Sequence, residues 1–346
     1  MKILAIETSC DETAAAVVTI AGKKPHLNSS VVYSQIREHQ KTGGIVPEVA
    51  SRVHVSHIAR VVGSALKNAK VTLNKIDYIA VTSAPGLTGS LLVGTSAAKT
   101  FAMTTGLPII PVNHLEGHMY SNFINEENKK NTFLFPAVVL LVSGGHTSLV
   151  LMKDHGKYKT LGYTVDDAVG EAFDKVAKIL DLGYPGGPAV SKLAQGFVGK
   201  ERYKLPRPMI DTGDFKFSFS GIKTAVLYAW QKEKSKTIKN KQAMAYAFEQ
   251  AVVDVLVSKT MMAAKKYKAE TVSICGGVAA NKRLREQLGE EIKNQLSTVS
   301  YVIPQIQFCG DNAAMIAMAA AYRLMNGKKV LKKTDLSFPV LSNKDL

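Results

Sequence analysis

The feature that most constrains the fold is an order of apolar segments that occurs twice along the chain. Residues 2–6 and 14–20 are two apolar runs joined by a polar turn, which predicts a β-hairpin. A short strand can follow at 31–34. In the rest of the first occurrence we expect a helix over 47–68 and a strand over 76–83. A helix then follows the loop 84–90 and ends at about 105, and a strand follows over 108–112.

The second occurrence begins with strands over 136–143 and 148–153 around a glycine turn. We then expect a helical region over 166–268 and a strand over 271–275. A helix over 280–295, a strand over 299–303 and the last helix over 311–326 complete the second occurrence. The duplication indicates an α/β protein of two related lobes, a fold in which ligands bind in the cleft at the strand ends. We expect one lobe over 1–112, completed by about 311–346, and the other over 113–310. The tail from Lys328 is expected to be peripheral.

Composition supports two lobes with a basic surface. The 346 residues are 46% hydrophobic, enough for two cores, and the net charge is +16. That charge favours a polyanion partner such as nucleic acid, although basic surfaces also serve solubility. The basic runs are 200–207, 232–241 and 328–333. The middle run has no aromatic residue, which suits phosphate contact better than base reading, and the alternative is a solvated loop.

Cysteine content and apolar run length indicate the compartment. Cys10, Cys275 and Cys309 are odd in number and widely spaced, so they form neither a disulfide framework nor a CxxC metal site. No apolar run is long enough to cross a bilayer, and the chain begins in an apolar strand rather than a signal peptide. We therefore expect a cytoplasmic protein without membrane contact.

His114-Leu115-Glu116-Gly117-His118 places two imidazoles one helical turn apart on one face, a platform for a metal ion. A zinc peptidase would need the glutamate directly after the first histidine, and Glu116 points to a different face. Asp311, near the start of the last helix, is the candidate third ligand. The alternatives are a chance histidine pair and an aspartate that only caps that helix.

Two glycine turns and a set of carboxylates are the other candidates. Ser143-Gly144-Gly145 follows a buried strand and could bind an anion through backbone N–H groups, or be a simple hairpin turn. Gly276 and Gly277 precede Asn281, an arrangement that can support a base or ribose but is also common in packing. Asp11, together with Glu7, Ser9 and Glu12, lies in the first hairpin turn, where carboxylates can be catalytic or merely solvated.

Taken together, these segments are far more specific than each alone. In order they are Glu7–Thr13, His114–His118, Ser143–Thr147, Gly170–Lys175, Tyr184–Pro188, Phe217–Ala225, Gly276–Asn281 and Cys309–Met315. The set resembles the tRNA threonylcarbamoyladenosine synthase family, in its bacterial and organellar branch, once described as O-sialoglycoprotein endopeptidases. The resemblance covers nearly the whole chain. Many relatives have an acidic residue near the ribose where this chain has Ser191.

The resemblance implies the actin/Hsp70/sugar-kinase fold, with two ribonuclease-H-like lobes around a ligand cleft. It implies transfer of threonylcarbamoyl from threonylcarbamoyl-AMP to N6 of the adenosine beside the tRNA anticodon, with AMP released. One divalent metal ion, iron or zinc, would be bound by His114, His118 and Asp311. A partner subunit of the same fold and a small ATPase complete the system in bacterial relatives.

The resemblance also implies a substrate site. Its residues are Leu141, Val142, Ser143, Gly144 and Gly145 along the substrate, Asp174 and Gly187 near the ribose, and Asn281 on the adenine side. Asp11 is our hypothesis for the general base. The competing functions are a metallopeptidase, an ATP-dependent kinase or ATPase of the same fold and a non-catalytic scaffold. The histidine pair argues against the kinase, because kinases bind Mg²⁺ through carboxylates and phosphates.

Overall fold

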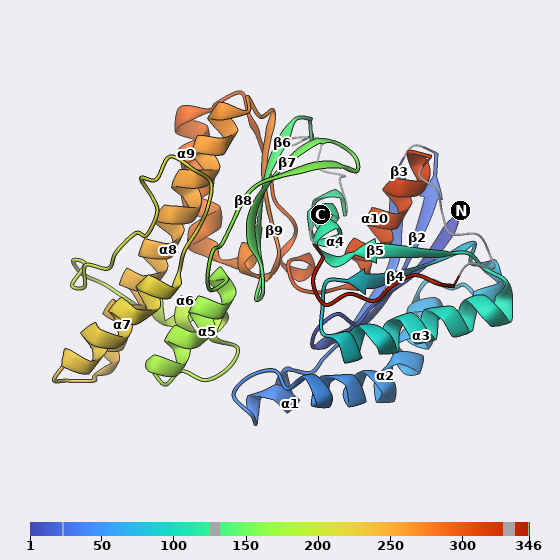
Figure 1. Cartoon of the computed structure of the whole chain (residues 1–346), viewed down its shortest axis with the longest axis horizontal. Helices are drawn as coiled ribbons and strands as arrows, with labels where there is room; N and C mark the ends of the chain where they lie inside the picture. The colour runs from blue at the N-terminus through green and yellow to red at the C-terminus, as the bar shows by residue number, and fades with distance from the viewer. Residues whose placement is uncertain (23, 125–131, 328–335, 345) are drawn as a thin grey trace. The chain divides into compact units, whose positions relative to one another are not determined.

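The computed structural model describes the chain except residues 23, 125–131, 328–335 and 345. It divides into two compact units (Figure 1). Unit 1 comprises Met1–Lys130 with Pro304–Leu346, and unit 2 comprises Asn131–Ile303. The unit boundaries therefore lie at 130/131 and 303/304, where the sequence predicts 112/113 and 310/311.

Unit 1 contains a five-stranded mixed sheet. Its strands are β1 (Lys2–Glu7), β2 (Glu12–Ala21), β3 (Lys24–Ser34), β4 (Tyr78–Ala84) and β5 (Ile109–Asn113). The spatial order is β3-β2-β1-β4-β5, with β1, β2 and β3 antiparallel and β4 and β5 parallel to β1. The predicted hairpin is confirmed, and β3 is longer than the predicted strand over 31–34.

Helices cover this sheet because each has one apolar stripe to bury. Unit 1 has α1 (Ile36–Gln40), α2 (Pro47–Asn68), α3 (Thr88–Thr105), α4 (His114–Tyr120) and α10 (Ala313–Met325). Apolar residues of α2 and α3, among them Val61 and Ala98, pack with Leu4 and Ile6 of β1 in one cluster. Helix α10, buried from Ala313 to Tyr322, packs against β1 and β2. These contacts fix the ends of β1 and β5 relative to the start of α10.

Unit 2 repeats the same sheet connectivity. Its strands are β6 (Ala137–Val142), β7 (Thr147–Asp154), β8 (Lys157–Tyr163), β9 (Thr271–Cys275) and β10 (Ser300–Val302), in the order β10-β9-β6-β7-β8. The first three strands are antiparallel, and β9 and β10 run parallel to β6 and to each other. In chain order both sheets therefore read 3-2-1-4-5, which confirms the duplication.

Between β8 and β9, unit 2 carries the predicted helical region. It contains α5 (Val169–Ile179), α6 (Gly186–Gln195), α7 (Ser220–Lys232) and α8 (Ile238–Lys266), while α9 (Lys282–Gln295) follows β9. The sequence analysis did not predict β8 or α6. Most residues of β8 are at least partly exposed, so it lacks the apolar run that marked the other strands. Helix α6 begins at Gly186-Gly187-Pro188, residues typical of a turn.

The C-terminal segment differs from the prediction. Leu336 and Phe338 pack against the unit 1 core, and the backbone N–H of Leu341 donates to the carbonyl of Ser83 at 3.1 Å. The described part of the tail, from Leu336, is therefore docked rather than peripheral, because the apolar side chains of this mostly polar segment pack against the core. The basic run 328–333 lies outside the described residues. None of the helices that are described could span a bilayer.

Candidate functional site

The two histidines lie on a short helix that starts directly after β5, the parallel strand at the edge of the unit 1 sheet. Asn113 is the last residue of β5. Its side chain caps α4 by accepting from the backbone N–H groups of Leu115 at 2.8 Å and Glu116 at 3.3 Å. A Cβ on Gly117 would lie 2.6 Å from the Cδ1 of Ile316. Glycine in the motif therefore lets α4 approach α10 closely, next to Asp311.

His114, His118 and Asp311 form one cluster, as the sequence predicts. The Nε2 atoms of His114 and His118 lie 3.5 and 3.2 Å from Oδ1 of Asp311, and all three ligand atoms lie within 4.8 Å of one another. Both imidazoles are buried. The cap of α10 is Asn312, whose side chain accepts from Met315 N–H at 3.0 Å. The alternative that Asp311 is only a helix cap is therefore wrong.

The cluster fits a metal ion. Ligands about 2.1 Å from an ion at tetrahedral angles lie about 3.4 Å from one another, close to the measured spacing. Among the described residues, Nδ1 of the buried His118 has no hydrogen-bond partner and Nε2 faces only the Asp311 carboxylate at 3.2 Å, an arrangement that a cation between these groups would stabilise. Two imidazoles and a carboxylate leave further coordination positions open and suit iron or zinc.

Glu7 is a fourth residue of this cluster. Its carboxylate is fully buried at the end of β1, where it accepts from Thr82 Oγ1 at 2.6 Å and from His114 Nδ1 at 3.1 Å. This contact places the proton on Nδ1 and leaves Nε2 to face Asp311. Burial opposes the imidazolium, but the charges of Asp311 and Glu7 outweigh it and raise the pKa of His114 to about 9. The cluster thus favours a positive charge.

The first hairpin turn carries two further carboxylates in unit 1. Burial, the charge of Asp11 and the charge of Asp311 raise the pKa of Glu12 well above its usual value. Asp11 itself is buried at 9% exposure. Glu12 is one of the turn carboxylates that the sequence marks as either catalytic or merely solvated. The raised pKa favours the protonated form of Glu12 beside Asp11.

His54 of α2 makes hydrogen bonds with two residues of this turn. Its Nε2–H donates to the carbonyl of Cys10 at 2.9 Å, and its Nδ1 accepts from Thr13 Oγ1 at 2.8 Å. Burial lowers the pKa of His54, so the ring is neutral and its tautomer is fixed by these two contacts. The sequence analysis missed this role, because a lone histidine in a helical pattern carries no signal of its distant partners.

Glu116 does not join the cluster. It is buried and pairs with Arg323 of α10, whose Nε lies 3.1 Å from Oε1 of the carboxylate. A glutamate held in this ion pair is not placed to act on a metal-bound water. This contact argues against a peptidase.

The predicted substrate residues of unit 2 lie at the carboxyl ends of two adjacent parallel strands. Leu141 of β6 pairs with Cys275 of β9, and the glycine turns follow directly. Gly276 has φ +92°, and a Cβ there would lie 2.3 Å from the carbonyl oxygen of Val142. Leu141 and Val142 are fully buried, whereas Gly144 and Gly145 are exposed, so of these residues the two glycines present most of the surface to a ligand.

A second group of substrate residues lies where α5 meets the start of α6. Oδ1 of Asp174 accepts from the backbone N–H of Gly186 at 2.8 Å, and a Cβ on Gly186 would lie 2.6 Å from the Cα of Asp174. Gly187 has open space where a Cβ would be. The fold thus brings Asp174 and Gly187 close together, as a shared role near a ribose requires.

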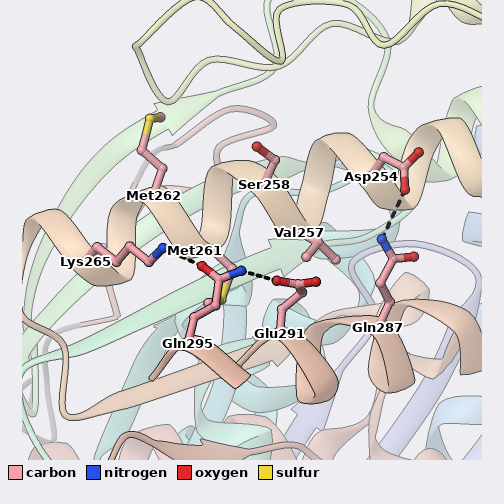
Figure 2. Close-up of a pocket in the computed structure, with 9 residues that line it drawn as sticks. All are labelled: Asp254, Val257, Ser258, Met261, Met262, Lys265, Gln287, Glu291 and Gln295. Carbon is pink, nitrogen blue, oxygen red and sulfur yellow. Dashed lines mark hydrogen bonds between the residues drawn. The ribbon is translucent and has the colours of Figure 1, made fainter. Parts of the chain in front are cut away.

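Asn281 caps α9 and contacts α6 and α8. Its Nδ2 lies 2.9 Å from Ser191 Oγ and 2.6 Å from Glu249 Oε1. Glu249 was not singled out from the sequence, where it follows Phe248 in a mostly buried helix and has no motif of its own. A separate cavity of about 480 Å³ lies between α8 and α9 (Figure 2). It contains none of the predicted substrate residues.

Comparison with known proteins decides the family. The model of the TsaD family, tRNA N6-adenosine threonylcarbamoyltransferase, matches residues 26–318. A tRNA N6-adenosine threonylcarbamoyltransferase of Listeria monocytogenes serotype 4b is 48% identical over 328 residues, 94% of this chain and 92% of that protein. The chain belongs to this family. The resemblance read from its motifs is confirmed.

Solved structures support the fold. The full-length HypF in its phosphate- and nucleotide-bound form superimposes with a TM-score of 0.60 and 15% identity, covering 94% of this chain and 47% of that one. The (R)-2-hydroxyglutaryl-CoA dehydratase component A of Acidaminococcus fermentans gives 0.54 and 14%, with 94% and 99% covered. The chain therefore has the predicted actin/Hsp70/sugar-kinase fold.

Proposed function

We propose that this chain transfers the threonylcarbamoyl group of L-threonylcarbamoyladenylate to N6 of the adenosine at position 37, beside the tRNA anticodon, and releases AMP. Its family makes it a tRNA-modifying transferase. The observation that carries the site assignment is the buried His114–His118–Asp311 cluster, in which His118 lacks any other partner among the described residues.

The reaction exchanges one acyl bond for another. The N6 amine forms a C–N bond to the carbamoyl carbonyl carbon, and the C–O bond to the phosphate breaks with its electron pair leaving on AMP. The amine loses a proton as the new bond forms. A weakly nucleophilic aromatic amine needs close positioning and an activated carbonyl for this step.

We assign one divalent ion, iron or zinc, to His114, His118 and Asp311. When bound, such an ion polarises a carbonyl oxygen and neutralises developing negative charge. The protein residues prepare its site. Glu7 orients His114 through Nδ1–H, and the short α4 presents both imidazoles on one face.

Asp11 is the proposed base that accepts the amine proton. Its neighbour Glu12 has a pKa raised by burial and by the charges of Asp11 and Asp311, which favours the protonated form of Glu12. His54 keeps the turn in place through the Cys10 carbonyl.

Unit 2 is proposed to bind the adenylate. Backbone N–H groups of Gly144 and Gly145 would meet its phosphate, Asp174 and Gly187 its ribose, and Asn281 its adenine side. The N–H of Ser143 instead donates to the carbonyl of His146 at 2.8 Å within the turn. The support is that these groups lie at neighbouring strand ends and helix starts, where α/β folds bind nucleotides. The partners we propose are tRNA, a same-fold subunit and a small ATPase, in the cytoplasm.

The test is a transfer assay with metal analysis. Purified protein, with and without candidate partners, is mixed with threonylcarbamoyl-AMP and unmodified tRNA, and nucleosides are identified by mass spectrometry. We expect modified adenosine from the wild type and none from His114→Ala, which should also lose metal. Metal-loaded protein that yields no product with any partner would contradict the proposal. The matched control is His26→Gln, an exposed histidine on β3.

A further inference from the structure

The orientation of the Asn281 side chain is fixed by three contacts within unit 2. Its Oδ1 accepts from the backbone N–H of Leu284 at 2.8 Å, the cap of α9. A backbone N–H can only donate, so the oxygen and nitrogen of the carboxamide are unambiguous. Both Nδ2 hydrogens then face inward, one to Ser191 Oγ and one to Glu249 Oε1.

Glu249 is the charged member of this arrangement. It lies in the middle of α8 and is 2% exposed. Each of its two carboxylate oxygens accepts a hydrogen bond from a residue at the start of α9. Oε1 accepts from Asn281 at 2.6 Å, and Oε2 accepts from Arg283 Nε at 2.9 Å. A buried carboxylate is tolerated because Arg283 neutralises it and both oxygens are hydrogen-bonded.

Arg283 is itself held in place, which makes the support rigid. Its guanidinium lies over the ring of Tyr246, 4.3 Å from the centroid, and its NH1 donates to Gln250 Oε1 at 2.7 Å. Gln250 Nε2 in turn donates to Asp254 and Gln287. Figure 2 shows the end of this hydrogen-bond network farthest from Asn281, where Gln287 donates to Asp254 beside the α8–α9 cavity.

We propose that Glu249 is a positioning residue for the adenylate: it holds the Asn281 carboxamide in the one orientation that the nucleotide meets. This inference rests on the proposed function, in which Asn281 contacts the adenine side. Glu249 acts through Asn281 and not by touching the ligand, because it is 2% exposed and its oxygens face Asn281 and Arg283.

The same geometry defines what the neighbouring Ser191 offers. Ser191 Oγ accepts from Asn281, so its own O–H remains to donate. An acidic residue at this position could only accept from a ribose hydroxyl. Glu249 therefore also determines what Ser191 can do. By accepting one N–H of Asn281, it directs the other N–H at Ser191 Oγ, so the Ser191 hydroxyl is left to donate.

The first test is a double-mutant cycle in the full-length enzyme with its partners. Glu249→Gln should raise the KM for threonylcarbamoyl-AMP and the Kd for AMP about tenfold, the size expected when a charged hydrogen bond is lost. The kcat and the KM for tRNA should stay within about twofold. In an Asn281→Ala background the same change should have almost no further effect. An equal effect in both backgrounds would overturn the proposal.

The second test swaps donor and acceptor, and it does not depend on one variant folding well. Asn281→Asp keeps the helix cap but faces Glu249 with a second carboxylate, so AMP binding should fall. Adding Glu249→Gln supplies an amide donor and should restore most of that binding. Failure of the double variant to improve on Asn281→Asp, with both variants shown to be folded by their melting temperatures, would contradict the proposal.

Glu290→Gln, an exposed change on α9, is the matched control and should alter nothing. The outcomes separate the two proposals. A wild type that neither binds AMP nor transfers threonylcarbamoyl would overturn the proposed function itself. A wild type that does both, with Glu249→Gln unchanged in KM and Kd, would overturn only the role of Glu249.

Discussion

The two units share one sheet connectivity but offer a ligand different chemical groups. In unit 1 the strand ends carry side chains: Glu7 closes β1, and the α4 histidines follow β5. In unit 2 the corresponding ends carry glycine turns, and the side chains of β6 are buried. A duplicated scaffold therefore does not fix the site. We propose that side chains let one end hold a cation and that the exposed glycine backbone of the other end suits a nucleotide.

The largest expected effect is in unit 1. His118→Ala removes one proposed ligand, so metal content should fall to background and turnover by at least about 10³-fold, as expected when several kcal/mol of charge stabilisation is lost. AMP binding should not change, because the nucleotide residues belong to unit 2. Metal analysis, turnover and AMP calorimetry on one preparation check this. Loss of AMP binding together with the metal would contradict the division of roles.

The next effect tests the backbone site of unit 2. Gly276→Ala places a Cβ 2.3 Å from the Val142 carbonyl oxygen at φ +92°, which should cost about 3 kcal/mol and weaken AMP binding. Gly277→Ala is the control, since a Cβ there meets no atom within 4 Å. Thermal melting and AMP titration measure both. Equal behaviour of the two variants would show that the close approach at Gly276 is unimportant.

Glu7→Gln should have a smaller effect, confined to unit 1. The amide is nearly isosteric but lacks the charge that orients His114, so metal affinity should fall about 10- to 100-fold. Turnover should recover when excess metal is supplied. Competition with a chelator measures the affinity. An unchanged affinity would mean that the contact between Glu7 and His114 does not tune the metal ligand.

The smallest effect concerns pH and the hairpin turn. Burial holds the pKa of His54 below its ordinary value of 6.5. Below that pH the unfolded chain takes up a proton that the folded chain resists, so unit 1 should lose stability as pH falls. His54→Gln should flatten this dependence, whereas the exposed His26→Gln should not. Melting temperatures between about pH 7 and pH 5 would reveal it.

Sequence patterns that depend on neighbours along the chain predicted most of the fold. Alternating apolar runs gave the first hairpin, and the i, i+4 histidines of α4 predicted one shared face. Contacts between distant segments were not predictable in this way. The support of Asn281 by Glu249 joins residues that are 32 positions apart in the sequence, and the docking of Leu336 on the core leaves no periodic signal.

The central claim is that the His114–His118–Asp311 cluster holds the ion on which transfer depends. The most direct measurement removes metal with a chelator, adds iron or zinc back in steps, and records bound metal and modified adenosine on the same samples. We predict that transfer is lost without metal, rises in proportion to occupancy and levels off at one ion per chain. Full transfer by metal-free protein would contradict the account.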